Sequence, residues 1–186
     1  MIDVRTTLLD EALPRFDVRS RHARRVAASP EAVWRAVEAY DPRRDASLIV
    51  RSLFLARGFG IPVGTIREVL AASGFTIIAE RPGSEIVAGT TGRFWALRER
   101  ANMAAPADLD AFLRFGRPGW AKAAVSVRVE PIDDASTDIV TETRVWCVDD
   151  HARRRFAAYW TVIGAFSGWI RHGVLRAVAR KAEEER

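Results

Sequence analysis

The carboxyl-terminal segment is the feature that most restricts the fold. From His151 to about Glu184 no proline interrupts the chain, so we expect one long helix. Residues at steps of three and four form a largely apolar stripe, which is the spacing of one helix face: Phe156, Trp160, Ile163, Ser167, Ile170, Val174 and Val178. Such a face must be covered by another element.

The first part of the chain predicts a strand followed by short helices. The strand covers Phe16–Val26. Ser29 and Pro30 are typical of a helix start, because serine caps the first turn and proline lacks only an N–H that has no partner there. Helical spacing then continues over Arg43–Arg57 and again from about Thr65 to Ala72.

After Gly74 the pattern becomes one of short β-type runs. Pro82 and Gly83 favour a tight turn between the first two runs, and one helical turn is predicted within Pro106–Phe115. The runs are Phe75–Glu80, Glu85–Thr91, Phe94–Arg98, Trp120–Ile132 and Ile139–Val148. The order predicts an α+β fold, in which a curved antiparallel sheet faces the long helix.

Four segments are similar to one known superfamily. They are the strand Val18–Val26 with the following Ser29-Pro30-Glu31-Ala32-Val33-Trp34, the strands Ala123–Glu130 and Thr141–Val145, and the closing helix with Phe156, Tyr159 and Trp160. Over residues 16–182 the chain resembles the START-like superfamily, also called SRPBCC. Its helix-grip fold is shared by birch-pollen-allergen-type proteins, lipid-transfer START domains and polyketide cyclases/aromatases.

The resemblance is to bacterial lipid-transport-like and polyketide cyclase-like members of the superfamily. It implies one START-like domain over residues 1–186. Residues 1–15 are an amino-terminal extension, 41–74 a helical insertion and 151–184 the long helix. It further implies a cavity between sheet and helix that binds an apolar small molecule of lipid or polyketide type. A length of 186 residues suits one domain.

Composition excludes several classes of protein. The single Cys147 cannot form an internal disulfide and favours a reducing compartment. No apolar run is long enough to span a bilayer, and the first residues lack a signal-peptide layout. We therefore expect a cytoplasmic monomer or homodimer.

The histidines and other reactive groups match no catalytic or metal-binding motif. His22 shares alternation with Phe16 and Val18, so it either faces the cavity as a proton donor or acceptor or is a structural histidine. His151 and His172 lack metal-ligand spacing, so we expect no metal and no cofactor.

Alternation on the last two strands separates two faces, of which the inner one carries Ala121, Ala123, Val125, Val127 and Val129 on the first strand and Ile139, Thr141, Thr143, Val145 and Cys147 on the second. Thr141 and Thr143 become the polar spots of the cavity floor, and Glu142 and Arg144 join Arg128 and Glu130 outside as exposed ion pairs. The alternative places Glu142 and Arg144 in the cavity, where they orient a polar ligand head.

The predicted ligand-binding residues combine these threonines with aromatic and helix residues, because tryptophan and tyrosine suit a pocket wall. They are Trp95, Trp120, Thr141, Thr143, Phe156, Tyr159, Trp160, Ile163 and Ser167.

Two other functions stay open. In a cyclase/aromatase-type enzyme, His22, Thr141, Thr143 and Tyr159 would steer proton transfers. In a nucleic-acid or protein-interaction module, the arginines would bind the partner, since all but Lys122 and Lys181 of the 29 basic residues are arginine. Acidic residues are interspersed with those arginines, and a mixed, solvated surface argues against nucleic acid.

Overall fold

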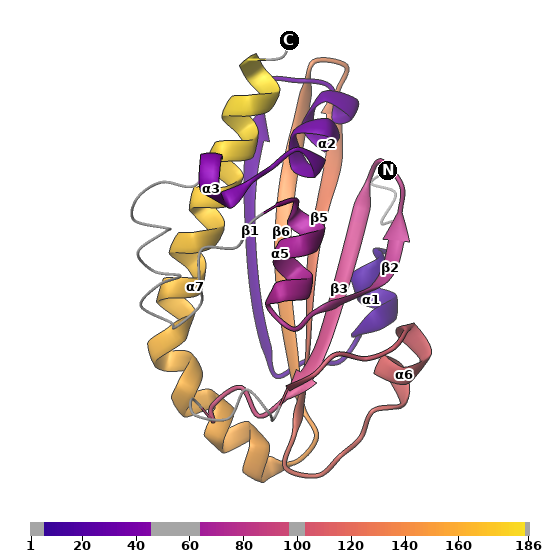
Figure 1. Cartoon of the computed structure of the whole chain (residues 1–186), viewed down its shortest axis with the longest axis vertical. Helices are drawn as coiled ribbons and strands as arrows, with labels where there is room; N and C mark the ends of the chain where they lie inside the picture. The colour runs from indigo at the N-terminus through magenta and orange to yellow at the C-terminus, as the bar shows by residue number, and fades with distance from the viewer. Residues whose placement is uncertain (1–5, 46–63, 97–102, 185–186) are drawn as a thin grey trace.

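The structure, a computed structural model, describes residues 6–45, 64–96 and 103–184. Its architecture is α+β, as the sequence predicts. The strands form one curved, six-stranded antiparallel sheet with the order β1-β6-β5-β3-β2, and β4 pairs with β3 (Figure 1). The strands are β1 (Val18–Val26), β2 (Thr76–Arg81), β3 (Glu85–Gly92), β4 (Met103–Ala104), β5 (Ala121–Asp133) and β6 (Ser136–Cys147).

Helices cover both faces of the sheet. The long helix α7 (Asp150–Glu184) packs against β1 and β6 and runs along the sheet from one end to the other (Figure 1). On the same face lie α2 (Pro30–Glu38), α3 (Pro42–Asp45) and α5 (Ile66–Ala72). The opposite face carries the short helices α1 (Leu8–Ala12) and α6 (Leu109–Arg114).

Local signals position the short helices as predicted. The Ser29 hydroxyl accepts a hydrogen bond from the Ala32 N–H at 3.3 Å, and Pro30 opens α2. In α5, Thr65 and Glu68 form a capping box. Of the helical pattern predicted over Arg43–Arg57, residues 46–57 lie outside the described part of the chain.

The predicted hairpin between β2 and β3 is confirmed, and one predicted strand is wrong. Gly83 has a φ of +76° in the turn between β2 and β3, a conformation that favours glycine. The predicted strand Phe94–Arg98 is a turn in its described residues, where the Ala96 N–H bonds to the Arg93 carbonyl at 2.9 Å. The rings of Phe94 and Trp95 pack on Phe156 of α7, with centroids 6.2 and 6.5 Å away, instead of extending along the sheet.

The sheet separates two apolar cores. Between the sheet and α7, the side chains of Val33, Ile139 and Leu175 are fully buried at one end of the interface. On the other face, Leu9 of α1 and Phe112 of α6 are also fully buried. Because both faces are covered, outward-facing residues of β5 and β6 are not automatically solvent-exposed.

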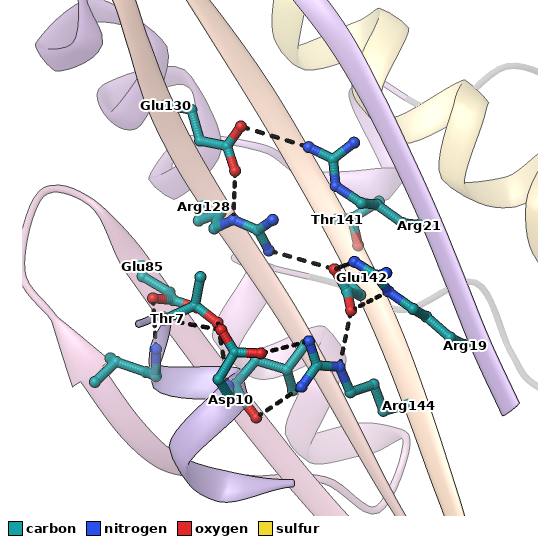
Figure 2. Close-up of polar contacts among 12 residues, drawn as sticks. Thr7, Asp10, Arg19, Arg21, Glu85, Arg128, Glu130, Thr141, Glu142 and Arg144 are labelled. Atoms are coloured by element: carbon teal, nitrogen blue, oxygen red, sulfur yellow. Dashed lines mark hydrogen bonds and ion pairs between the residues drawn. The ribbon is translucent and has the colours of Figure 1, made fainter. Parts of the chain in front are cut away.

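This covering corrects one prediction about charge. Glu142 and Arg144 do lie on the outer face, but only 1% of Glu142 and 6% of Arg144 is exposed, because α1 packs over this part of the sheet. Glu142 accepts hydrogen bonds from Arg19 at 2.7 Å and Arg144 at 2.8 Å, and Arg144 also donates to Asp10 of α1 at 2.7 Å (Figure 2). The group is therefore a buried ionic network that fastens α1 to the sheet.

In the described part of the chain, none of the helices combines the length and apolarity that crossing a membrane requires.

Candidate ligand-binding site

A large cavity lies between the inner face of the sheet and α7. Its volume is about 830 Å³, within the range of roughly 300–1,000 Å³ usual for small-molecule sites. The sheet supplies its floor through Ala123, Val125, Val127, Ile139, Thr141, Thr143 and Val145, which are the inward positions predicted from alternation. The opposite wall is the apolar stripe of α7. The remaining side is closed by α2 and α5 and by the residues that directly follow them, through Val37, Tyr40, Ile66, Val69, Leu70 and Ser73.

Aromatic rings gather near the start of α7, in its first three turns. Phe156 is at the centre of this group: its ring stacks on Trp160 with a centroid separation of 5.7 Å and meets Tyr159 at 5.8 Å. Phe94 contacts Phe156 edge to face, which is a favourable arrangement for two rings. All four residues line the cavity. This end therefore offers an aromatic wall.

Polar groups in the cavity are few. Arg93 is an exposed member of the lining, and a hydrogen-bonded group that includes Arg171 lies near the middle of α7. Arg171 donates from Nη1 to Thr141 Oγ1 at 3.0 Å and from Nε to Ser167 Oγ at 3.4 Å. Burial lowers the pKa of Arg171 to about 10, so the guanidinium stays protonated at neutral pH.

Two hydroxyls add to this polar lining. Thr143 Oγ1 and the Tyr40 hydroxyl are buried and have no hydrogen-bond partner among the described residues. Burial, with the nearby charges of Asp45 and Asp41, raises the pKa of Tyr40 well above its ordinary value. Tyr40 is therefore a neutral hydrogen-bonding group rather than a base.

His22 lies beside the cavity rather than in its lining. It sits between β1 and α7, where its Nδ1 is 3.2 Å from Nε2 of His172 and its Nε2 is 3.1 Å from Ser20 Oγ. Burial lowers the pKa of His22, and the neighbouring His172 and Arg171 lower it further. The ring is thus neutral at pH 7 and serves as part of the seam between strand and helix.

Most of the predicted ligand-binding residues meet in the cavity wall. Trp95 and Trp120 do not: the Trp95 ring packs on Phe156 with centroids 6.5 Å apart, and Trp120 packs on Phe115 at 5.9 Å with Arg117 over its ring. The residues that line the cavity are Thr141, Thr143, Phe156, Tyr159, Trp160, Ile163 and Ser167. Their role in binding a ligand stays a prediction.

Sequence reasoning missed Arg171 and the contribution of α5. Arg171 borders the apolar stripe, and its position one turn after Ser167 was the available signal. By contrast, Arg154, Arg176 and Arg180 of α7 are exposed and do not line this cavity. The arginines of α7 therefore differ in exposure because they lie on different faces of the helix.

Cys147 belongs to the apolar packing beside the aromatic end. It is 1% exposed and contacts the cluster that includes Ala152 and Phe156. Burial and the carboxylate of Asp17 raise its pKa to about 12, so the thiol is protonated and unreactive at neutral pH.

Comparisons with known proteins yield distant structural likenesses. No family model matches the sequence, and no curated protein matches it. Among solved structures, a conserved protein from Geobacillus kaustophilus has a TM-score of 0.44 at 10% identity, over 90% of this chain and 96% of that one. A hypothetical protein from Helicobacter pylori has a TM-score of 0.43 at 10% identity, over 98% and 97% of the two chains. The Zhui aromatase/cyclase from Streptomyces sp. R1128 has a TM-score of 0.32 at 15% identity, over 89% and 93%.

Proposed function

We propose that this protein binds a hydrophobic or amphipathic small molecule, lipid-like or polyketide-like, in the cavity between the sheet and α7. The observation that carries the proposal is the cavity itself: about 830 Å³ with a mainly apolar wall and a few convergent polar groups. A space of this size beneath a helix forgoes packing energy. Binding of an apolar molecule would restore those contacts.

The proposal includes a START-like, helix-grip identity for residues 1–186 as one domain, supported by the element order and by the position of the cavity against α7. The unpaired, buried Cys147 supports a reducing, cytoplasmic location.

A cyclase/aromatase-type enzyme is the second candidate, because hydroxyls of Thr141, Thr143 and Tyr159 line the cavity. General acid–base catalysis also needs groups that exchange protons near neutral pH. The described lining residues include no histidine and no carboxylate. This composition favours binding over catalysis for the described part of the site.

The first experiment identifies the occupant. Protein purified from its own host is measured by native mass spectrometry, and any bound molecule is released and identified. Incubation of that molecule with ligand-free protein then separates the candidates, since a carrier returns it unchanged and an enzyme converts it to a product that differs in chromatographic retention, even where a ring closure leaves its mass the same.

A variant that fills the cavity tests the location. Val125 faces the cavity from β5, and we expect Val125→Trp to abolish most of the fluorescence gained by the neutral probe N-phenylnaphthylamine. Ile132→Trp is the matched control, because Ile132 lies on the same strand and is 47% exposed. Equal probe binding by both variants would place the binding site elsewhere and refute the proposal.

A further inference from the structure

Arg171 is partly buried and differs from the two buried arginines of the described residues, Arg128 and Arg144. On the outer face of the sheet, Arg144 pairs with Asp10 and Glu142, and Arg128 pairs with Glu130 at 2.7 Å. Arg171 forms no ion pair within 4.0 Å with any carboxylate of the described residues. Its two hydrogen bonds go to neutral hydroxyls.

The guanidinium retains hydrogen-bonding capacity toward the cavity. It has five N–H donors, and the bonds to Thr141 and Ser167 engage Nη1 and Nε. The donors of Nη2 and the second hydrogen of Nη1 have no partner among the described residues. Free donors on the two terminal nitrogens of a guanidinium can both donate to one carboxylate, which accepts them as two parallel hydrogen bonds.

The electrostatic surroundings also favour an anion. A buried charge without a counter-charge is costly, and a bound anion offsets that cost. The nearest titratable neighbours on β1 and α7 are His22 and His172, which carry no negative charge at any pH. Arg93 also lines the cavity, but its side chain is exposed. The guanidinium of Arg171, beside neutral hydroxyls and a neutral His22, therefore balances one negative charge at this point of the cavity, not two.

We propose that Arg171, together with Thr141, binds the carboxylate of an amphipathic acid whose apolar chain occupies the rest of the cavity. This assignment rests on the proposed ligand-binding function and specifies its ligand class. Ile170 and Val174 flank the arginine on α7, and the wall of α5 lies across the cavity. The chain therefore meets apolar side chains as soon as it leaves the head group.

The test compares two ligands that differ only in the head group. Delipidated protein is titrated with dodecanoate and with dodecanol, each measured by displacement of N-phenylnaphthylamine. We expect wild type to prefer dodecanoate. Arg171→Gln should weaken dodecanoate binding by roughly 10-fold to 100-fold, the value of a charge-assisted hydrogen-bonded pair, and change dodecanol binding less than about twofold.

Two further variants make the result specific. Arg176→Gln removes an exposed arginine from the same helix and should leave both affinities unchanged. Arg171→Lys keeps the charge but loses the two-pronged geometry, so an intermediate affinity for dodecanoate is expected. Circular dichroism verifies that each variant is folded, and Arg171→Lys carries the test if Arg171→Gln does not fold.

The outcomes distinguish this inference from the function on which it rests. Equal binding of both ligands, unaffected by Arg171→Gln, overturns the carboxylate assignment and leaves the apolar-ligand proposal intact. Dodecyl phosphate that outcompetes dodecanoate by more than about tenfold overturns the choice of a singly charged head group. Failure of both ligands and of the probe to bind overturns the proposed function together with this inference.

Discussion

Replacing Glu142 with alanine removes the carboxylate that several arginines share beneath α1. Arg19 and Arg144 donate to it at 2.7 and 2.8 Å, and Arg128 lies 3.7 Å from it. Burial by itself would raise the pKa of Glu142, but the hydrogen bonds from Arg19 and Arg144 outweigh burial and lower it. The ionised form is therefore the one on which the network depends.

The expected loss in the free energy of unfolding depends on the carboxylate partners that the arginines keep. Removing one partner of a buried pair costs about 3–5 kcal/mol when the other charge is left uncompensated. Arg144 keeps Asp10 and Arg128 keeps Glu130, so we expect the lower limit for Glu142→Ala, about 3 kcal/mol. For a chain of this size that loss lowers the Tm by about 6–12 °C.

Urea denaturation followed by circular dichroism measures the change in the free energy of unfolding. Asp110→Ala is the matched control, because Asp110 and Arg114 form a pair whose side chains are 74% and 75% exposed; its cost should be below about 1 kcal/mol. Glu142→Leu combined with Arg144→Leu should cost less than the two single changes added together, since the pair is removed without leaving either charge alone.

A loss below about 1 kcal/mol for Glu142→Ala would refute the buried-network reasoning and show that these residues behave as ordinary surface ion pairs.

Acid gives an independent test of the same network. Asp10, whose carboxylate bonds to Thr7 and Arg144, has its pKa lowered from 3.8 to about 2. Its contribution to stability is present above about pH 4 and is lost as the pH falls through about 2.

Two further predictions concern packing. The pKa of His22 is lowered in the folded state, so the stability of the protein should fall as the pH drops below about 6.5, where the unfolded chain gains the proton and the folded one does not. His22→Gln should reduce the dependence of Tm on pH between about pH 7.5 and 5.5. An identical effect of the control His151→Gln, which changes an exposed histidine, would contradict the assignment. Gly89→Ala should lower the free energy of unfolding measured by urea denaturation by about 1–3 kcal/mol, because the added Cβ would lie 2.9 Å from Ile78 and 3.0 Å from Phe112. An unchanged urea concentration at half unfolding would show that these two side chains move aside without loss of stability.

Local patterns predicted the elements that frame the cavity. Alternation on β5 and β6 placed Val125 and Thr141 on the inner face, and helical spacing placed Ile163 on the covered face of α7. These predictions succeed because side-chain direction repeats every two residues in a strand and every 3.6 in a helix. The periodicity is a property of the local backbone and needs no knowledge of the tertiary fold.

Predictions that depended on distant parts of the chain failed or fell short. Alternation identified the face of Glu142 but not its burial, because the cover comes from α1, which lies more than a hundred residues away in sequence. The run Phe94–Arg98 has strand-like composition, yet Phe94 and Trp95 turn toward α7 to pack on Phe156. Arg171 borders a charged helix face in sequence, and only the folded chain brings it to Thr141.

The burial of Cys147 makes the labelling rate of its thiol a measure of how often this part of the protein opens. Thiol reagents react with the thiolate, and here the sulfur is both covered and held protonated. Labelling can therefore proceed only when the packing of Ala152 and Phe156 over the end of β6 is released. Because Phe156 also belongs to the aromatic wall, the labelling rate with and without ligand measures how firmly an occupant holds that end of the molecule closed.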